Sequence, residues 1–528
     1  MREPSMSFTD ILFIVALAGP VGFLVAGIVP PGNGRNGTGA LLASRVASVI
    51  ALGGALFAVV LCVLTPGHRL VLSGVAGVDL LLDPVSVTVF ALVSFIGAVV
   101  IQYSRNYLDG DPGQGAFMRR LCIVLAAVQL LILSGNLVML TLAWIATSLV
   151  LHKLLVFYPE RPAARLAAHK KFLIARASDA SLVAASVLLY LQFGTLDIAR
   201  IIEAAGTEAG ATSGATIAAT FLVALAALLK SAQFPFHGWL PEVMETPTPV
   251  SALLHAGIIN AGGFLLIRFA DVLLLNETAM IAVALIGLAT ALFGSLCMLV
   301  QSSVKVSLAY STIAQMGFML LQCGLGAFSA ALVHLVAHSL YKAHAFLSAG
   351  SALDVAKLDV IASPAASVER QAALRVAPVM VLVSGAIFAG LALAWEETRT
   401  PILLAFVLGG ALLQLLLSGG TMLRGGPLVG FMAQLATVAL VYFAIQGAAA
   451  WLLSQTLPLS APVSPVVALI VIGGFCATWW MQLSARSGHP PAWLWHLYVP
   501  LRHGFYVNAA FDRLVGSLNN HSAPLKGN

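Results

Sequence analysis

Three side chains that can exchange protons recur at helical spacing within one apolar stretch: His334, His338 and Lys342. Positions i, i+4 and i+8 lie on one face of an α-helix, so the three groups are expected to form a stripe. Titratable groups inside a membrane span are costly to insert and commonly mark ion or proton pathways. The stripe therefore predicts a proton-conducting surface. The alternatives are a metal site, for which no third ligand lies nearby in sequence, and a packed polar stripe without a transport role.

A second candidate is Lys230, which ends a long apolar run and is followed by Pro235 and Pro241. Proline lacks an amide donor and clashes with the preceding turn, so this pattern predicts a broken helix beside a buried amine. The alternative is a lysine whose amine extends to the membrane surface from a helix end. His255 lies eight residues into the next apolar run and can lie close to the break. It is either a proton relay or an ordinary packed histidine.

Other charged residues within apolar runs are further candidates for a proton or cation pathway. Asp179 follows Arg176 by three residues, so the two can neutralise each other, or Asp179 can supply the anion for Lys230. Lys305 begins another apolar run and is either a pathway residue or an anchor at the membrane surface. The secondary candidates are His152, Lys153 and Arg176, because they lie near the same apolar runs.

The chain that carries these residues has the composition of a membrane protein. It has 528 residues, of which 60% are apolar and 9% are charged, whereas soluble domains carry roughly 25% charged residues. This composition excludes a soluble enzyme, a nucleic-acid binder and a disordered chain. The sequence has no ATP-binding, dinucleotide-binding or zinc-protease motif, and none of its five cysteines forms a CxxC pair. No cofactor or metal is therefore expected in this chain.

Apolar runs near the roughly 20 residues that a spanning helix needs are expected in fifteen places. They are 8–30, 39–64, 83–103, 118–135, 137–158, 171–193, 214–232, 248–270, 279–300, 304–325, 327–352, 376–395, 401–422, 428–453 and 464–484. Apolar residues occupy all sides of these segments and do not alternate with polar residues, which excludes a β-barrel. The fold class expected is an all-α polytopic membrane protein with about 14–15 transmembrane helices.

Positive charge between the spans predicts the orientation of the chain. It is concentrated after the odd-numbered spans, which places the N-terminus outside and the tail after Ser484 in the cytoplasm. The residues assigned to these loops include Arg35, Arg45, Arg105, Arg119, Arg120, Arg161, Arg165, Lys170, Arg176, Lys357, Arg370 and Arg375. The tail sequence WLWHLYVPLRHGFYVNAAFDRL predicts an amphipathic helix at the membrane surface, either packed on the protein or docking a partner.

Several long motifs resemble the antiporter-like subunits of respiratory complex I and of multisubunit sodium/proton antiporters. They are LLKSAQFPFHGWLPEVMETPTPVSALLHAGIINAGGFLLIRF, VKVSLAYSTIAQMGFM, HLVAHSLYKAHAFLSAG and AAHKKFLIARASDASLVAASVLLYLQFGTLDI. The resemblance covers roughly residues 80 to 355. It implies two inverted five-helix repeats, each with one broken helix. It also implies Lys230 as the central lysine, Asp179 as its acidic partner, and a hydrophilic axis formed by His255, His334, His338 and Lys342.

The same resemblance implies a division of the chain into four parts. N-terminal helices occupy 1–117, the first repeat 118–270, and a second, degenerate repeat 271–425. The remaining helices and a cytoplasmic tail occupy 426–528.

The sequence departs from the respiratory subunits at two charged positions. Trp144 is followed by Ile145, where those subunits carry a glutamate that pairs with the central lysine. Residues 376–424 contain no lysine, although the second broken helix of the family normally carries one. The tail after Ser484 is also expected to be too short for the long lateral helix of those subunits. These departures count against a role in a quinone-linked redox complex.

One branch of the family fits these departures. WIATSLVLHKLLVFY followed by AAHKKFLIARASD resembles the membrane subunits (DabB-type) of DAB inorganic-carbon accumulation complexes. In that branch a soluble zinc subunit related to β-carbonic anhydrase (DabA-type) sits on the membrane subunit. The resemblance implies that protons, or alternatively sodium ions, flow through this chain in a bacterial inner membrane and drive hydration of CO2 to bicarbonate by the partner.

On this interpretation the chain is a transporter subunit and not itself an enzyme. Protons are expected to hop among Asp179, Lys230, His255 and the stripe. The alternatives are a stand-alone cation/proton antiporter and a subunit of a quinone-linked proton pump.

Overall fold

The computed structural model describes a helical chain that separates into two units. It describes residues 8–30, 38–64, 69–73, 77–206, 213–350, 386, 399–418, 428–458, 463–486 and 491–520. The first unit comprises Met1–Met280, Ala331–Leu347 and Trp451–Pro458, and the second comprises Ile281–Ala330, Ser348–Ala450 and Leu459–Asn528.

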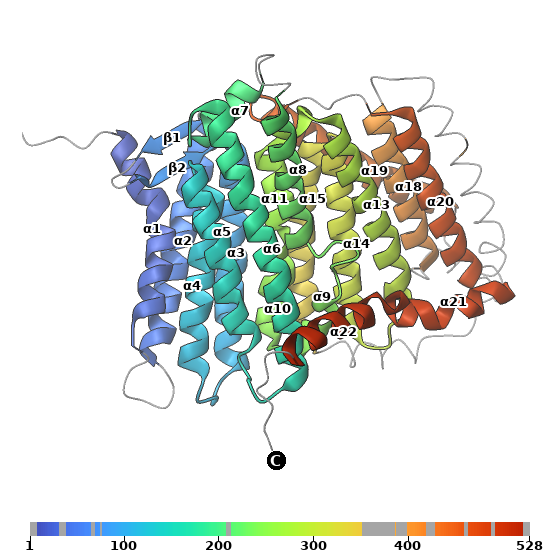
Figure 1. Cartoon of the computed structure of the whole chain (residues 1–528), viewed down its shortest axis with the longest axis horizontal. Helices are drawn as coiled ribbons and strands as arrows, with labels where there is room; N and C mark the ends of the chain where they lie inside the picture. The colour runs from blue at the N-terminus through green and yellow to red at the C-terminus, as the bar shows by residue number, and fades with distance from the viewer. Residues whose placement is uncertain are drawn as a thin grey trace, which may run out of the picture. The chain divides into compact units, whose positions relative to one another are not determined.

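Helices form most of the first unit, and α1 to α6 run side by side along it (Figure 1). In chain order its elements are α1 (Phe8–Ile28), α2 (Thr38–Leu64), β1 (Leu70–Ser73), β2 (Asp79–Leu82), α3 (Pro84–Tyr107), α4 (Gln114–Leu133), α5 (Leu137–Leu155), α6 (Pro162–Phe193), α7 (Ile198–Ala205), α8 (Gly214–Lys230), α9 (Trp239–Glu242), η3 (Val243–Glu245), α10 (Thr248–Ala256), η4 (Ile258–Asn260), α11 (Ala261–Arg268) and α12 (Ala270–Leu274). The unit also contains most of α15 (Phe328–Leu347).

Local sequence explains where several of these helices begin and end. Asp83 caps α3 by accepting a hydrogen bond from the Ser86 amide, and Pro84 fits the first turn because it needs no donor there. Asn136 caps α5 by accepting from the amide of Met139. The long helix α6 ends at Gly194, whose φ of +66° is readily adopted only without a Cβ atom.

The prediction of an all-α polytopic membrane protein is confirmed. Each expected span overlaps a helix or a broken pair of helices, except 376–395, of which only Ala386 is among the described residues. Among the described residues, ten helices are long and apolar enough to cross a membrane. Large apolar side chains such as Val25, Leu42 and Leu142 are exposed on these helices, as expected for a surface in contact with lipid. The inverted repeats and the four-part division stay predictions.

The prediction that the sixth span begins at residue 171 is wrong. α6 begins at Pro162, so Arg165, Lys170 and Arg176 lie within a helix and not in a loop. Lys170 is buried within α6, and its ion pair with Glu242 compensates the buried charge. Positive residues assigned to other loops also lie within helices: Arg45 in α2, Arg105 in α3, and Arg119 and Arg120 in α4.

A short β-hairpin precedes α3 and was not expected from the sequence. Its strands β1 and β2 are antiparallel, with Leu70 opposite Leu82 and Ser73 opposite Asp79. The Leu80–Leu82 side chains are buried, so the hairpin covers part of the apolar core at one end of the helices.

The second unit is also helical. Its elements are α13 (Glu277–Leu299), which enters the unit at Ile281, α14 (Val304–Gly324), the first turn of α15, α18 (Arg399–Ser418), α19 (Leu428–Leu453) up to Ala450, α20 (Pro465–Arg486), α21 (Ala492–Arg502), η6 (Gly504–Tyr506) and α22 (Val507–Asn520). Leu288, Leu321, Phe406 and Trp479 belong to its apolar core. The predicted tail helix is present as α21 and α22, separated by the turn at Gly504–Tyr506.

Candidate functional site

The predicted break after Lys230 is present in the first unit. α8 ends at Lys230, residues 231–238 form turns, and α9 begins at Trp239. Ala232 is buried and has a φ of +49°, a conformation that costs free energy for a residue with a Cβ atom. Such backbone is tolerated at membrane depth where protein covers it. The break places the end of α8 and its lysine inside the helix bundle.

Neutral groups of α5 bind the Lys230 amine. Nζ of Lys230 donates to Ser148 Oγ at 2.5 Å and to the carbonyl oxygen of Trp144 at 3.1 Å. The amine also lies 4.3 Å from the centroid of the Trp144 ring, in cation–π geometry. The Lys230 residue is only 7% exposed, so its amine is held inside the protein and does not extend to the surface. Trp144 precedes Ile145, the position at which the respiratory subunits carry their glutamate.

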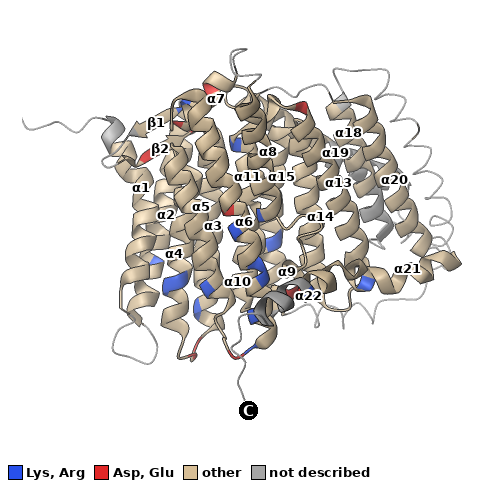
Figure 2. Cartoon of the chain, viewed as in Figure 1, with Lys and Arg blue, Asp and Glu red and all other residues tan. Residues whose placement is uncertain are grey.

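A second buried lysine, Lys171, reaches the same serine from α6. Its Nζ donates to the backbone carbonyl of Ser148 at 2.9 Å, and the charge of Lys230 acts on it. Lys171 was not among the residues predicted from the sequence, because it lies at the start of the predicted span 171–193. The available signal was helical spacing, since Lys171 and Asp179 are eight residues apart and share one helix face. Figure 2 shows the Lys and Arg positions near α6 and α10, with an acidic position beside them.

Asp179 forms its direct ion pair with Arg176 and not with Lys230. Arg176 Nη2 lies 2.5 Å from Asp179 Oδ2. Neither carboxylate oxygen accepts an aligned hydrogen bond from the described residues. The Asp179 carboxylate nevertheless interacts electrostatically with Lys230, Arg176 and Lys171. The structure thus contains the Arg176–Asp179 pair in which the two residues neutralise each other. A role for Asp179 in protonating Lys230 stays a prediction.

A second break follows His255, which the sequence analysis did not predict. α10 ends at Ala256, Gly257 interrupts the helix, and the short η4 leads into α11. The His255 side chain is fully buried, and its ring stacks on Phe346 of α15 at a centroid distance of 4.3 Å. The available signal was the pair of Gly257 and polar Asn260 in an otherwise apolar run.

The predicted stripe lies on α15, and the structure brings His255 next to it. His338 makes a hydrogen bond with the backbone of His255. The rings of His334 and His338 are 6.1 Å apart. Lys342 is fully buried, and its Nζ lies 5.6 Å from the Tyr341 ring. Four of the predicted pathway residues therefore form one cluster.

Hydrogen bonds through η4 connect the break after Lys230 with this cluster. Ser231 Oγ donates to the carbonyl of Ile259 at 3.1 Å. Asn260 Nδ2 donates to Ser339 Oγ at 2.7 Å and to the carbonyl of Ala256 at 3.0 Å. Ser339 directly follows His338, so η4 is hydrogen-bonded both to the residue after Lys230 and to the helix that carries the stripe. Gly262 permits this approach, because a Cβ atom there would lie 2.2 Å from Ser231 Oγ.

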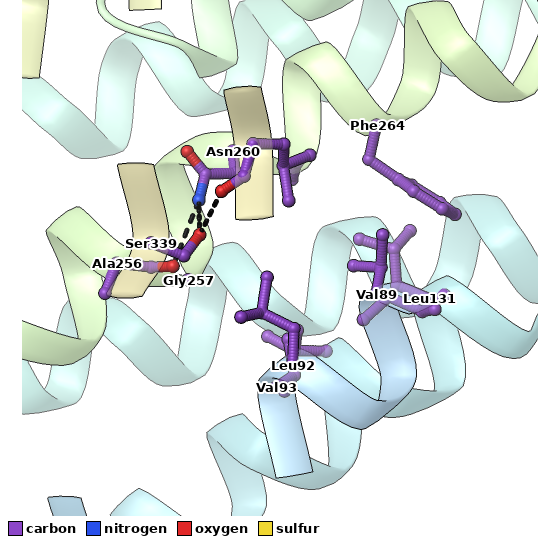
Figure 3. A pocket seen from close by; sticks show the side chains of 13 residues that line it. Val89, Leu92, Val93, Leu131, Ala256, Gly257, Asn260, Phe264 and Ser339 are labelled. Atoms are coloured by element: carbon purple, nitrogen blue, oxygen red, sulfur yellow. Dashed lines mark hydrogen bonds between the residues drawn. The ribbon is translucent and has the colours of Figure 1, made fainter. Parts of the chain in front are cut away.

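A small cavity lies beside the Asn260–Ser339 hydrogen bond (Figure 3). Its volume is about 20 Å³, which is room for roughly one water molecule. Most of its wall is apolar and includes Val89, Leu92 and Leu131. Asn260 Oδ1 has no hydrogen-bond partner among the described residues, so a water molecule would find an acceptor here.

The remaining predicted residues lie outside these contacts. His152 is half-buried and packs 5.3 Å from the Phe172 ring. Lys153 is exposed. Lys305 belongs to the second unit, where it is the second residue of α14 and half-buried.

Our sequence analysis also missed the ion pair between Lys170 and Glu242. Lys170 Nζ donates to both carboxylate oxygens of Glu242, at 2.6 and 2.8 Å. The lysine side chain is fully buried, and Glu242 lies in α9, after the break. The pair therefore fixes α6 to the segment that follows Lys230. Adjacent Lys170 and Lys171 serve different partners, because neighbouring helical positions point in directions about 100° apart.

The broken helices and the buried lysine–histidine series are those of an antiporter-like membrane subunit, and the chain belongs to that family. Residues 134–422 match the family model described as "NADH:quinone oxidoreductase/Mrp antiporter, TM". Residues 74–118 match "NADH-Ubiquinone oxidoreductase (complex I), chain 5 N-terminus". The chain is thus a multi-pass membrane protein of an ion-transporting family.

Two similar proteins carry the name of an inorganic carbon transporter subunit. The chain is 38% identical to "Probable inorganic carbon transporter subunit DabB2" of Halothiobacillus neapolitanus, over 97% of this chain and 95% of that protein. It is 48% identical to "Probable inorganic carbon transporter subunit DabB" of Hydrogenovibrio crunogenus, over 51% of this chain and 52% of that protein.

A solved structure shares the fold. A chain of the Mrp complex from Dietzia sp. DQ12-45-1b superposes with a TM-score of 0.55 at 22% identity, covering 98% of this chain and 58% of that one.

Proposed function

We propose that this chain conducts protons as the membrane subunit of a complex that accumulates inorganic carbon as bicarbonate. In this proposal a soluble or peripheral zinc subunit of the carbonic-anhydrase type hydrates CO2, and proton movement through this chain drives the reaction in one direction. The chain itself carries no zinc chemistry. It lies in a bacterial plasma membrane with its N-terminus outside, as the distribution of positive residues favours.

One observation carries the proton-conducting part of this proposal. A series of buried side chains that exchange protons or form hydrogen bonds begins with Lys230 at the end of α8. It continues through Asn260 and Ser339 and reaches His338 and Lys342 on α15. Buried amines and imidazoles are expensive in a membrane protein and are retained where they serve transport. Their contacts through two helix breaks support a route for protons along the first unit.

The partners of Lys230 suit a group that must release its proton. Desolvation disfavours the charged form of a buried amine. Ser148 and Trp144 supply neutral acceptors and a ring face, and no carboxylate among the described residues pairs directly with the ammonium. Asp179 stabilises the ammonium from a longer range while paired with Arg176. A small displacement of Asp179 relative to Lys230 would then shift the balance between the loaded and unloaded amine.

The names of the relatives support the inorganic-carbon part. A relative that aligns over nearly the whole of both chains carries that name. The alternative is a cation/proton antiporter subunit, which the description of the matched family favours. The two functions differ in their requirement for a zinc partner and in their response to sodium.

A growth assay tests the proposal. A bacterial host without carbonic anhydrase grows in air only if it accumulates bicarbonate. We expect this chain and the zinc subunit together to restore growth, each alone to fail, and Lys230→Ala to abolish growth at equal protein level in the membrane. Lys153→Ala is the matched control, because it removes an exposed lysine close to the same site.

Two outcomes would overturn the proposal. Growth of the Lys230→Ala strain at the wild-type rate would exclude this lysine from the pathway. Sodium-dependent proton flux by the chain alone, together with no growth when the zinc subunit is also present, would favour the antiporter.

A further inference from the structure

Two buried lysines converge on one residue of α5. Lys230 donates to the hydroxyl of Ser148, and Lys171 donates to the carbonyl oxygen of the same Ser148. The lysines come from different helices, α8 and α6, and neither is more than 7% exposed. Ser148 itself is 1% exposed. Bulk water therefore screens neither amine.

The charges around the two amines do not balance if both are protonated. Arg176 already pairs with Asp179, so these two charges neutralise each other. The charge of Lys171 acts on His152, which would add positive charge if protonated. The direct acceptors of both amines are neutral oxygens. Two like charges that share a buried site cannot both be retained, so such a pair titrates as a unit.

We infer that Lys171 and Lys230 form a coupled pair that holds one proton, and that Lys171 exchanges this proton with Lys230 through the Ser148 hydroxyl. This inference rests on the proposed function and adds a proton-carrying residue to it. The side chain of Lys171 moves from the carbonyl to the hydroxyl of Ser148 by rotation about its terminal bonds. An N–H bond of the Lys230 ammonium then breaks as its proton passes to Ser148 Oγ. The Ser148 hydroxyl proton passes to the Lys171 amine, where a new N–H bond forms, and the serine is unchanged.

A purely structural role for Lys171 makes a different prediction. In that case the residue matters only as a hydrogen-bond donor to Ser148, and arginine should replace it because the guanidinium also donates. A residue that must release its proton cannot be replaced by arginine, which does not deprotonate in proteins. Lys171→Arg therefore separates the two roles.

Proton flux into membrane vesicles that contain the full chain tests the inference, with a pH-sensitive dye inside the vesicles. We expect Lys171→Met and Lys171→Arg each to lower the flux at least tenfold. Lys153→Met should leave it unchanged, because that side chain is exposed and makes none of these contacts. Wild-type flux in Lys171→Met, or rescue of flux by Lys171→Arg, would overturn the inference.

A serine variant keeps the test decisive if the lysine variants do not reach the membrane. Ser148→Ala removes the shared hydroxyl but keeps the carbonyl that Lys171 contacts, and we expect at least a tenfold loss of flux. Thr147→Ala is the matched control, since the buried hydroxyl of Thr147 donates to the carbonyl of Ala143 and, among the described residues, contacts neither lysine. Equal flux in the two variants would overturn the shared-proton model.

The Lys230→Ala strain distinguishes the failure of this inference from failure of the proposed function. If Lys230→Ala is inactive while Lys171→Met is active, only the coupled pair is wrong. If Lys230→Ala is itself active, the proposed pathway is wrong and the pair with it.

Discussion

The Lys230 amine lies 4.3 Å from the centroid of the Trp144 ring and donates a hydrogen bond to the carbonyl oxygen of the same residue. A single tryptophan thus offers this lysine both a ring face and a backbone acceptor. The next residue, Ile145, is apolar, and α5 contains no carboxylate. A dipole and a π-face attract an ammonium less strongly than an anion does, which leaves the proton on Lys230 easier to release.

Removal of the Trp144 ring should weaken proton loading of Lys230. A cation–π contact in a desolvated site is worth about 2 kcal/mol, which corresponds to roughly a thirtyfold change in an equilibrium constant. We expect Trp144→Leu to reduce proton flux about 10- to 30-fold, because it keeps the carbonyl and loses only the ring. Trp144→Phe should retain more flux than Trp144→Leu. If the two variants conduct equally, the ring face has no role.

Neutralising Asp179 should be nearly as damaging as removing Lys230. Asp179→Asn deletes the anion that interacts with Lys230, Lys171 and Arg176, so protonation of the buried amines is disfavoured. We expect at least a tenfold loss of bicarbonate uptake. The double variant with Lys230→Ala should be little worse than either single change, because residues that act as one unit are not additive.

The alternative for Asp179 is that it only neutralises Arg176. In that case Asp179→Asn would leave uptake largely intact, or the further change Arg176→Gln would restore it. Uptake measured in the wild type, both single variants and the double variants separates these interpretations. Protein levels in the membrane must be equal for the comparison.

Asn260 should be required for proton passage between Lys230 and the stripe on α15. Asn260→Leu removes the hydrogen bonds to Ser339 Oγ and the Ala256 carbonyl, and it puts an apolar side chain of nearly the same shape beside the neighbouring cavity. We expect at least a tenfold loss of flux. The control is Ile259→Val, since only the carbonyl of Ile259 contributes to the polar contacts. Full flux in Asn260→Leu would place the route elsewhere.

The ion pair between Asp83 and Arg268 should stabilise the first unit and not conduct protons. Arg268 Nη1 lies 2.5 Å from Asp83 Oδ2, and both side chains are buried. Removing one partner of a buried pair costs about 3–5 kcal/mol of the free energy of unfolding. We therefore expect Arg268→Gln to lower the thermal unfolding temperature in detergent. Arg200→Gln, at an exposed pair, should change the free energy of unfolding by less than about 0.5 kcal/mol.

The same pair should make stability depend on pH. Burial raises the pKa of Asp83, but the Arg268 guanidinium and hydrogen bonds from Ser86 lower it more, so the pKa is held below its usual range. A carboxyl with a depressed pKa stabilises the folded state above its unfolded pKa of about 3.9. That contribution is lost as the pH falls through the folded pKa. The loss of folding stability at low pH should be smaller in Arg268→Gln than in the wild type. An equal dependence of stability on pH in the two proteins would contradict a stabilising role for the Asp83–Arg268 pair.

Local sequence alone determined the break after Lys230 and the stripe on α15, because both depend on neighbouring residues. Pro235 and Pro241 after a lysine predict the end of α8, because proline removes amide donors wherever it occurs. The spacing of His334, His338 and Lys342 places them on one face of any helix they form. Apolar runs long enough to cross a bilayer predict the helical class, because unpaired backbone groups are not tolerated in lipid.

Tertiary structure decided which groups these residues contact. Lys171 and Lys170 are neighbours in sequence, yet one reaches Ser148 and the other Glu242. Asp179 pairs within its own helix, while Lys230 takes its partners from α5. These choices depend on the rotation and depth at which each helix packs against the next. Neither quantity is encoded in a local pattern, because both follow from the sum of contacts between segments far apart in the chain.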